Sequence, residues 1–310
     1  MTPGRRLALR AASWTVLAAG LSMPKLRPRM GLPRPIALGI VAVGPAAAAV
    51  GIPRSRWRSY AVFLAGMWAY LRAFELTYTK PERLGRRLVI DAPIAVDRAL
   101  GAGRTPTQRL QSWREHSPRR ELADRLIGGV YFAWAAQRHA VMLWLLRRHQ
   151  GRFARGAALV GASFDVAWVI FSVVPVAPPW WAAKRGRLPG VRRVTVDVSA
   201  ALPLVPEQNE VDDDQGNPWA STPSQHAASA AMLAIVASEV DARVGVAAWG
   251  YAAALGVALV YLGEHYLADV LSGFALAAAI HRAEPLARVP ARRIAAVADE
   301  LSSIAWPARP

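Results

Sequence analysis

Two histidines and one carboxylate have the types and the spacing needed to act on a phosphate group. The string P-S-Q-H ends at His226 and opens one apolar stretch, and G-E-H ends at His265 after a second. His265 and Asp269 are four residues apart, which places them on one face of a helix. A carboxylate beside a histidine fixes the tautomer of the ring and stabilises its positive charge during attack. The turn at Ser224 adds the free N–H groups of a helix N-terminus, which suit a phosphate.

Each of these residues alone is an ordinary polar residue at the end of a membrane helix. The two strings occur in order, however, and a hairpin of two apolar helices returns the second string to the membrane surface at which the first begins. Residues distant in sequence are thereby brought to one face of the membrane. The combined pattern therefore favours an active site containing His226, His265 and Asp269.

The composition indicates that the elements around this site are membrane helices. The chain has 310 residues, 54% of them hydrophobic, with 38 Lys and Arg against 21 Asp and Glu and no cysteine. The apolar fraction excludes a disordered basic chain, and the missing cysteines exclude a disulfide framework and a cysteine-ligated zinc site. Basic clusters lie between apolar runs of membrane length, a pattern of polytopic membrane proteins that argues against nucleic-acid binding.

The apolar runs predict an all-α, polytopic membrane helix bundle of about seven spans, with six to eight possible. A further basic-then-apolar run at 7–23 lacks a clear cleavage site, so we expect an extra span or an interfacial helix rather than a signal peptide. The seven candidate spans are 36–52, 59–78, 126–146, 156–176, 226–240, 244–262 and 267–280.

Arginine clusters predict the orientation of these spans. The short loops 53–58 and 146–156 and the tail after residue 281 are rich in arginine and fall on one side by the count of spans. The positive-inside rule makes that side cytoplasmic. The loops 79–125 and 177–225, and the candidate site with them, then face away from the cytoplasm. Loop 79–125 is itself basic, but long loops obey the rule weakly.

The apolar runs also predict that the chain is a multi-pass protein of the cell membrane, and they divide it into five parts. For 79–125, an interfacial helix or lid and a plain solvated loop both remain open. The expected parts are a basic N-terminal segment (1–34), two N-terminal spans (35–78), an extracytoplasmic loop or lid (79–125), the catalytic membrane core (126–281) and a cytoplasmic tail (282–310).

The motifs resemble those of the phosphatidic acid phosphatase type 2 superfamily. The P-S-x-H string, the helical hairpin and H-x-x-x-D carry this resemblance, which covers roughly residues 57–281. The strings V-P-V-A-P-P-W, from Val174, and N-P-W-A-S-T-P-S, from Asn217, are similar to the inositol phosphorylceramide synthase-like (inositolphosphotransferase) branch. D-R-A-L, from Asp97, is similar to that branch as well.

The resemblance implies a role for each motif residue. His265 would attack phosphorus to form a phosphohistidine, Asp269 would orient it, and His226 would protonate the leaving oxygen. Ser224 would lie near the phosphate. No metal and no other cofactor is implied. The implied substrate is a lipid phosphate or phospholipid among membrane lipids, and no nucleic acid is expected as a partner.

Three functions are compatible with these residues. Transfer of a phosphate-linked headgroup from a lipid donor to a hydroxyl acceptor would make the protein a phosphotransferase, which we favour. Transfer to water would make it a phosphatase of lipid phosphates or polyprenyl diphosphates. The third is a catalytically silent binding or transport protein, which the intact set of His226, His265 and Asp269 argues against.

The sequence departs from the superfamily where a phosphate-binding arginine is expected. Leu259 occupies the position six residues before His265, and no K-x6-R-P string precedes the P-S-x-H motif. Arg72, Lys184 and Arg185 are therefore candidates for holding the phosphate, because a guanidinium or ammonium can supply the missing charge. Further candidates in the same loop as Lys184 are Arg187, Arg192 and Arg193. Alternatively, Arg72 forms an ion pair with Glu75, or its side chain extends to the membrane surface.

Two charges lie deep inside predicted spans. Arg138 and Asp165 are both nine residues from the predicted cytoplasmic ends of their helices, so they fall at similar depths. An unpaired charge at that depth is costly. We therefore expect a buried ion pair between them with a structural role.

Overall fold

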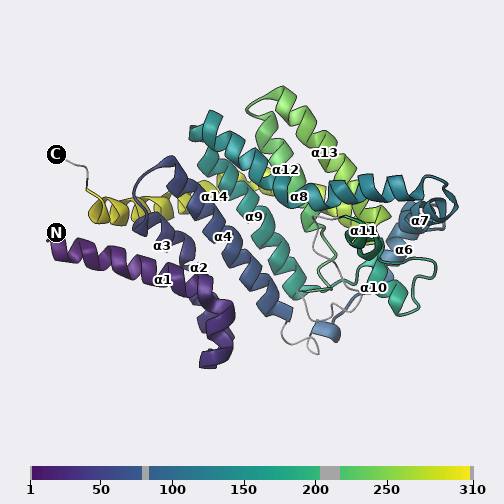
Figure 1. The fold of residues 1–310 in the computed structure, drawn as a ribbon, viewed down its shortest axis with the longest axis horizontal. Helices are drawn as coiled ribbons and strands as arrows, with labels where there is room; N and C mark the ends of the chain where they lie inside the picture. The colour runs from purple at the N-terminus through teal and green to yellow at the C-terminus, as the bar shows by residue number, and fades with distance from the viewer. Residues whose placement is uncertain (1, 79–83, 203–216, 308–310) are drawn as a thin grey trace. The chain divides into compact units, whose positions relative to one another are not determined.

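The computed structural model describes residues 2–78, 84–202 and 217–307 of the chain, and it confirms the all-α fold (Figure 1). Within these ranges every regular element is an α-helix. Two isolated β-bridges, between Val89 and Val176 and between Val176 and Ala220, are the only extended pairing that the described residues make.

Three segments are long and apolar enough to cross a membrane, which indicates a membrane protein. They are Arg34–Gly51, which combines α2 (Arg34–Ala42) and α3 (Gly44–Gly51), α9 (Gln150–Val173) and α13 (Ala242–Tyr261). A fourth apolar helix, α12 (Gln225–Ser238), is shorter. The predicted total of about seven spans stays a prediction. The remaining helices are α1 (Pro3–Met30), α4 (Arg56–Tyr78), α6 (Asp91–Leu100), α7 (Pro106–His116), α8 (Arg120–Arg148), α10 (Pro179–Lys184), α11 (Val194–Ala201) and α14 (Leu267–Ala305).

The chain divides into two compact units, and long helices run from one into the other. Unit 1 comprises Met1–Leu76, Leu143–Gly161 and Arg282–Pro310, and unit 2 comprises Thr77–Met142 and Ala162–His281. Unit 2 contains both histidines of the predicted site, so its internal packing is what positions them.

In unit 1, side chains that donate to backbone carbonyls join segments that are far apart in the chain. The Arg10 guanidinium donates to the carbonyl of Ala305, with its Nε at 2.8 Å. The Trp68 indole donates to the carbonyl of Gly20 at 3.0 Å. These bonds satisfy polar groups that would otherwise be costly to bury.

In unit 2, α12 and α13 form an antiparallel hairpin of small residues (Figure 1). Ten of the fourteen residues of α12 are buried, most of them alanines. Asp241 caps α13 by accepting hydrogen bonds from the N–H groups of Arg243 and Val244 at 2.8 and 3.1 Å. At the turn, a Cβ on Gly245 would lie 2.4 Å from the Ser238 hydroxyl, so this approach requires glycine. Small residues therefore let the two helices pack closely.

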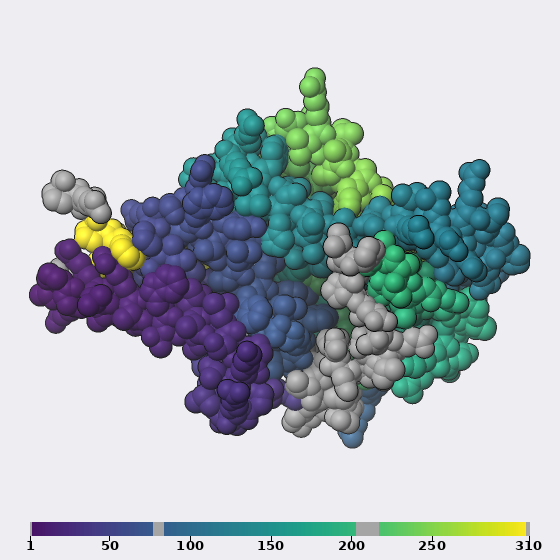
Figure 2. Space-filling view, in the orientation of Figure 1, coloured from purple at the N-terminus to yellow at the C-terminus, as the bar shows by residue number. Residues whose placement is uncertain are grey.

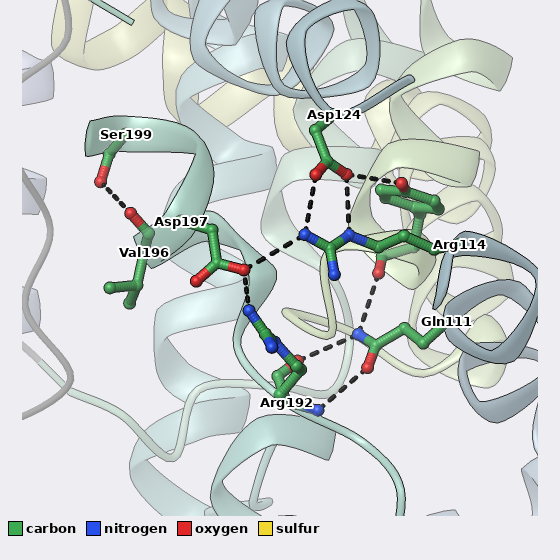
Figure 3. A network of polar contacts seen from close by, with 8 residues as sticks. Gln111, Arg114, Asp124, Arg192, Val196, Asp197 and Ser199 are labelled. Carbon is green, nitrogen blue, oxygen red and sulfur yellow. Dashed lines mark hydrogen bonds and ion pairs between the residues drawn. The ribbon is translucent and has the colours of Figure 1, made fainter. Parts of the chain in front are cut away.

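A polar network in unit 2 ties α7 and α8 to the segment around α11 (Figure 3). Arg114 makes a two-pronged ion pair with Asp124 at 2.7 and 2.8 Å and also reaches Asp197 at 3.2 Å. The buried Gln111 amide bonds to the backbone of Arg192 and to the carbonyl of Tyr261. Figure 2 shows the surface of α7 beside that of α10 and α11. Part of the predicted loop 79–125 is thus helical and bonded to the end of α13.

Candidate active site

The turn after α13 places His265 through a glycine-dependent helix cap. The N–H groups of Gly263 and Glu264 donate to the carbonyls of Val260 and Leu259, at 3.2 and 3.1 Å. This is the bond pattern of a Schellman cap, and Gly263 has the left-handed φ of 79° that such a cap requires. A Cβ at Gly263 would also lie 2.6 Å from the carbonyl oxygen of Arg192. The string G-E-H therefore ends α13 and delivers His265 directly after the cap.

The two histidines are in direct contact. His265 Nε2 lies 3.3 Å from His226 Nδ1, and the ring centroids are 5.4 Å apart. His265 Nδ1 lies 3.0 Å from the carbonyl oxygen of Ser221, which only accepts, so this nitrogen carries the proton. The Nε2 lone pair of His265 then faces His226, whose Nδ1–H is the donor between them. This assignment from the hydrogen bonds leaves the lone pair of the His265 ring on Nε2.

Asp269 reaches His265 mainly through Ser221. Its carboxylate accepts hydrogen bonds from the Ser221 hydroxyl at 2.6 Å, from the Thr222 hydroxyl, and from the Tyr266 N–H at 2.8 Å. Its own distance to His265 Nδ1 is 3.5 Å, longer than that of the Ser221 carbonyl. The carboxylate is fully buried and His265 is 5% exposed. Asp269 therefore holds Ser221, and Ser221 orients the ring.

Two short backbone pairings hold the Ser221 segment in place. Val176 donates its N–H to the carbonyl of Trp219 at 2.8 Å, and Ser221 donates to the carbonyl of Val176 at 3.3 Å. On its other side, Val176 is bridged to Val89. Sequence reasoning quoted the proline-rich string from Val174 and the A-S-T-P-S string only as marks of resemblance. It did not assign a role to Ser221 or Thr222, although serine and threonine before a proline were a visible signal.

Ser224 begins α12 and links it to α14. Its side chain accepts a hydrogen bond from the Ala227 N–H at 3.3 Å, and its own N–H donates to the Asp269 carbonyl at 2.9 Å. A Cβ on Gly273 would lie 2.4 Å from the Ser224 carbonyl oxygen. Ser224 is fully buried. It is a helix cap at the base of the site, and phosphate contact by Ser224 stays a prediction.

Asp97, on α6, caps the helix that carries Asp269. Its carboxylate accepts hydrogen bonds from the N–H groups of Leu267 and Ala268, at 3.1 and 2.9 Å. These are donors of the first turn of α14, which have no partner within the helix. Burial raises the pKa of the Asp97 carboxyl above its usual range, and the two N–H groups oppose that shift. The string from Asp97 thus has a structural explanation.

Aromatic side chains of α8 cover His226. The centroid of the Trp134 ring lies 4.3 Å from that of His226, and the Tyr131 ring lies 5.5 Å from it. The Trp134 indole donates to the Ser229 hydroxyl at 3.0 Å, which fixes its orientation. Neither residue was singled out from the sequence, because aromatic residues on a membrane helix are commonplace.

The cations proposed from sequence lie in different settings. Arg72 belongs to unit 1, where it pairs with Glu75 at 2.5 Å and lies 4.4 Å from the Trp68 ring. In unit 2, Lys184 and Arg185 are exposed at the end of α10, with Arg185 4.6 Å from the Trp181 ring. Phosphate binding by all three stays a prediction.

Arg193 contacts the residue that precedes His265 in the chain. It forms an ion pair with Glu264, the neighbour of His265, at 2.8 Å. Its guanidinium also lies 4.5 Å from the ring of Trp180, and the Trp180 N–H donates to the carbonyl of Gly263 at 3.1 Å. The charge of Arg193 is therefore largely compensated by Glu264.

The expected ion pair between Arg138 and Asp165 is wrong. Asp165 is exposed on α9, and among the described residues no ion pair joins it to Arg138. The Arg138 guanidinium lies over the rings of Trp134 and Phe164, at 4.9 and 5.2 Å. Adjacent residues of a helix point about 100° apart, so the buried Phe164 directs Asp165 elsewhere. Equal depth in two helices does not establish that two side chains face each other.

Comparison with known proteins found a match to a family model. A family model described as the PAP2 superfamily matches residues 94–283. The matched region includes His226, His265, Asp269 and the capping residue Asp97. Searches of curated proteins and of solved structures found no significant match.

Proposed function

This chain belongs to the PAP2 superfamily, and on that premise we propose that it is an integral membrane phosphotransferase of the inositol phosphorylceramide synthase-like branch. Membership indicates phosphatase or phosphotransferase activity. We propose that the donor is a lipid phosphate or phospholipid and that the acceptor is a hydroxyl. The observation that carries the proposal is the contact between His265 and His226, with the Nδ1 proton of His265 held by Ser221.

The first step forms a phosphohistidine. Nε2 of His265 attacks phosphorus, the bond from phosphorus to the leaving oxygen breaks, and that oxygen takes a proton from the imidazolium form of His226, which becomes neutral. The proton on Nδ1 of His265 stays hydrogen-bonded to the Ser221 carbonyl, and the Asp269 carboxylate, which accepts from the Ser221 hydroxyl, stabilises the positive charge of the ring. A histidine oriented in this way needs no further activation as a nucleophile.

The second step regenerates the enzyme. The now neutral His226 accepts the proton of the acceptor hydroxyl, whose oxygen attacks the phosphohistidine, and the bond from nitrogen to phosphorus breaks. A lipid or sugar hydroxyl yields a new phosphodiester, whereas water yields free phosphate or a phosphomonoester. The alternative function is therefore a lipid phosphate or polyprenyl diphosphate phosphatase that uses the same residues.

We further propose that the site faces away from the cytoplasm and that basic residues at the membrane surface guide the anionic headgroup. Ser224, Arg72, Lys184 and Arg185 are the substrate-binding residues expected from sequence. The arginines of the short loops 53–58 and 146–156 support this orientation through the positive-inside rule.

Product analysis tests the proposal directly. Purified protein in detergent would receive phosphate-labelled phosphatidylinositol or polyprenyl diphosphate, with and without a lipid hydroxyl acceptor, beside a His265→Ala control. Label in a new phosphodiester lipid, absent from the control, supports the transferase. Label released as inorganic phosphate supports the phosphatase. If the control forms the same products at the same rate, His265 is not the nucleophile and the mechanism is wrong.

A further inference from the structure

Residues 285–297 of α14, called the exposed segment below, are helical but lack a cover. Every residue of this segment is exposed, and the side chains include Leu286 at 83% and Ile294 at 71% exposure. Pro285 and Pro290 lie inside the helix, where each removes a backbone hydrogen bond. An isolated helix of about 12–15 residues is only marginally stable in water. The exposed segment therefore needs a partner that the described residues of unit 1 do not supply.

Both ends of the exposed segment are bonded to candidate membrane spans of unit 1. Before it, Glu284 makes a two-pronged ion pair with Arg155, near the beginning of α9, at 2.8 and 2.6 Å. After it, the Trp306 indole donates to the carbonyl of Val50 at 3.1 Å, next to the end of the span Arg34–Gly51. A spanning helix ends at the surface of the membrane. The exposed segment consequently runs between two anchors at a membrane surface.

Large apolar side chains lie on one face of the exposed segment. Three of them follow Leu286 after 3, 8 and 11 positions, and at about 3.6 residues per turn these spacings place all of them on one side of the helix. The four residues of this apolar face are Leu286, Val289, Ile294 and Val297, and all are exposed. Such a face, beside basic residues, is typical of a helix that lies in the interface of a membrane.

The charge of the exposed segment favours an anionic surface. It contains three arginines, Arg288, Arg292 and Arg293, and no acidic residue. Arg288 and Arg292 lie opposite the apolar face, and Arg293 lies within it, where a long side chain can extend its charge to the surface. Arg288 is 3.5 Å from Glu284, which makes a shorter ion pair with Arg155. Each basic residue close to an anionic membrane increases the affinity about fivefold.

We propose that the exposed segment lies along the membrane surface and binds the headgroups of anionic phospholipids. The apolar face enters the boundary between headgroups and acyl chains, and the arginines contact lipid phosphates. The arginine-rich short loops predict that this side is cytoplasmic, where anionic lipids are concentrated. A second copy of the chain is a poorer partner, because two exposed segments placed together would bring their arginines close to one another. This contact is separate from the candidate active site and does not depend on the proposed function.

Fluorescence of the full-length protein in lipid nanodiscs tests the proposal. Because the chain has no cysteine, a polarity-sensitive fluorophore can be attached to Ile294→Cys, on the apolar face. Ala295→Cys, whose side chain points away from that face, is the matched control. Nanodiscs of phosphatidylcholine are compared with nanodiscs that contain equal parts of phosphatidylcholine and phosphatidylglycerol. We expect the probe at 294 to emit at shorter wavelength in the anionic nanodiscs, and the probe at 295 to emit as it does in water.

Removal of the arginines tests the role of charge. Combining Arg288→Gln, Arg292→Gln and Arg293→Gln should lower the ratio of bound to free segment by about 10²-fold, so the probe at 294 should then emit as in water. The control variant removes the same number of charges from exposed positions in unit 2 and should keep the shift of the probe. Its three substitutions are Arg104→Gln, Arg119→Gln and Arg120→Gln. If the first variant fails to fold, the comparison of neutral with anionic nanodiscs decides.

Three results would overturn the proposal. Emission as in water from the probe at 294, in both kinds of nanodisc, would show that the exposed segment does not enter the lipid. An equal shift in neutral and anionic nanodiscs would show that anionic headgroups are not required. Disulfide formation in high yield between the Ile294→Cys residues of two copies would show that a second copy covers the apolar face. None of these measurements uses turnover, so failure of the proposed function leaves this test intact.

Discussion

Ser221 links the buried carboxylate of Asp269 to the ring of His265. Its hydroxyl donates to Asp269 and its carbonyl accepts from His265, so one residue connects the charge to the ring. The Asp269 carboxylate is further fixed by Thr222 and by the N–H of Tyr266. A fully satisfied buried network of this kind holds a single geometry, and a partly satisfied one does not.

Asp269→Asn should lower kcat by about 10²–10⁴, because an amide supplies no negative charge to the imidazolium and presents N–H groups to the Ser221 and Thr222 hydroxyls. The measurement is kcat for lipid substrate in detergent, with the melting temperature as a check on folding. Thr222→Val, which removes a bond to the same carboxylate but not the link to His265, is the matched control and should lose about tenfold or less. Equal losses of kcat in the two variants would contradict a link from Asp269 to His265 through Ser221.

At the scale of elements, close helix contacts place the two ends of the hairpin. Gly273 on α14 lies directly against the backbone at Ser224, and Gly263 ends α13 two residues before His265. The start of α14 is in turn capped from α6 by Asp97. Alignment of the histidines therefore depends on helix ends that are fixed by specific small or acidic residues.

Gly273→Ala should destabilise the protein by about 1–3 kcal/mol, because its Cβ would lie 2.4 Å from the Ser224 carbonyl oxygen and α12 would have to move. Gly250→Ala is the control, since a Cβ there meets nothing within 4 Å. The control variant should have the same free energy of unfolding as the wild type or one up to about 1 kcal/mol higher, because alanine has a higher helix propensity than glycine. Thermal unfolding in detergent measures the stability of both variants. A change of the same sign in the two would argue against the close approach of Gly273 to Ser224.

Asp97→Ala should lower stability by about 2 kcal/mol or more, because two N–H groups at the start of α14 lose their acceptor. Asp97→Asn keeps one acceptor oxygen and should recover part of the loss. Melting temperature and kcat would be recorded for both variants. Activity should fall with stability, since the same turn carries Asp269. An alanine variant as stable and active as the wild type would exclude the capping role.

At the scale of the whole molecule, the described residues include apolar segments of membrane length, and His265 and Asp269 are buried within unit 2. Three segments meet the length and composition of a span, and the α12–α13 hairpin is built from small, buried residues. Because the chain has no cysteine, a single introduced cysteine reports on its own position without interference.

Labelling of single cysteines tests the predicted orientation. Arg98→Cys in the α6 region should react with a membrane-impermeant maleimide in intact cells. Arg148→Cys and Arg292→Cys should react only after the membrane is opened, because arginine-rich short loops and tails stay in the cytoplasm. The reverse pattern would place the active site on the cytoplasmic side.

The superfamily, the all-α class and the contact between His226 and His265 could be predicted from short strings of residues and from the lengths of apolar runs. Proximity of His226 to His265 and Asp269 could be predicted because a hairpin of two helices returns the chain to the end at which the first helix began. Those inferences depend on local patterns, which a sequence displays directly.

Only the tertiary structure determined which side chains face the histidines. Ser221, Tyr131 and Trp134 contact the site through residues far apart in the chain, and Arg138 turned out to face aromatic rings rather than Asp165. Helical spacing gives the position of a side chain along and around its own helix. The rotation of that helix against its neighbours depends on packing of all the surrounding side chains together, and a single sequence does not display it.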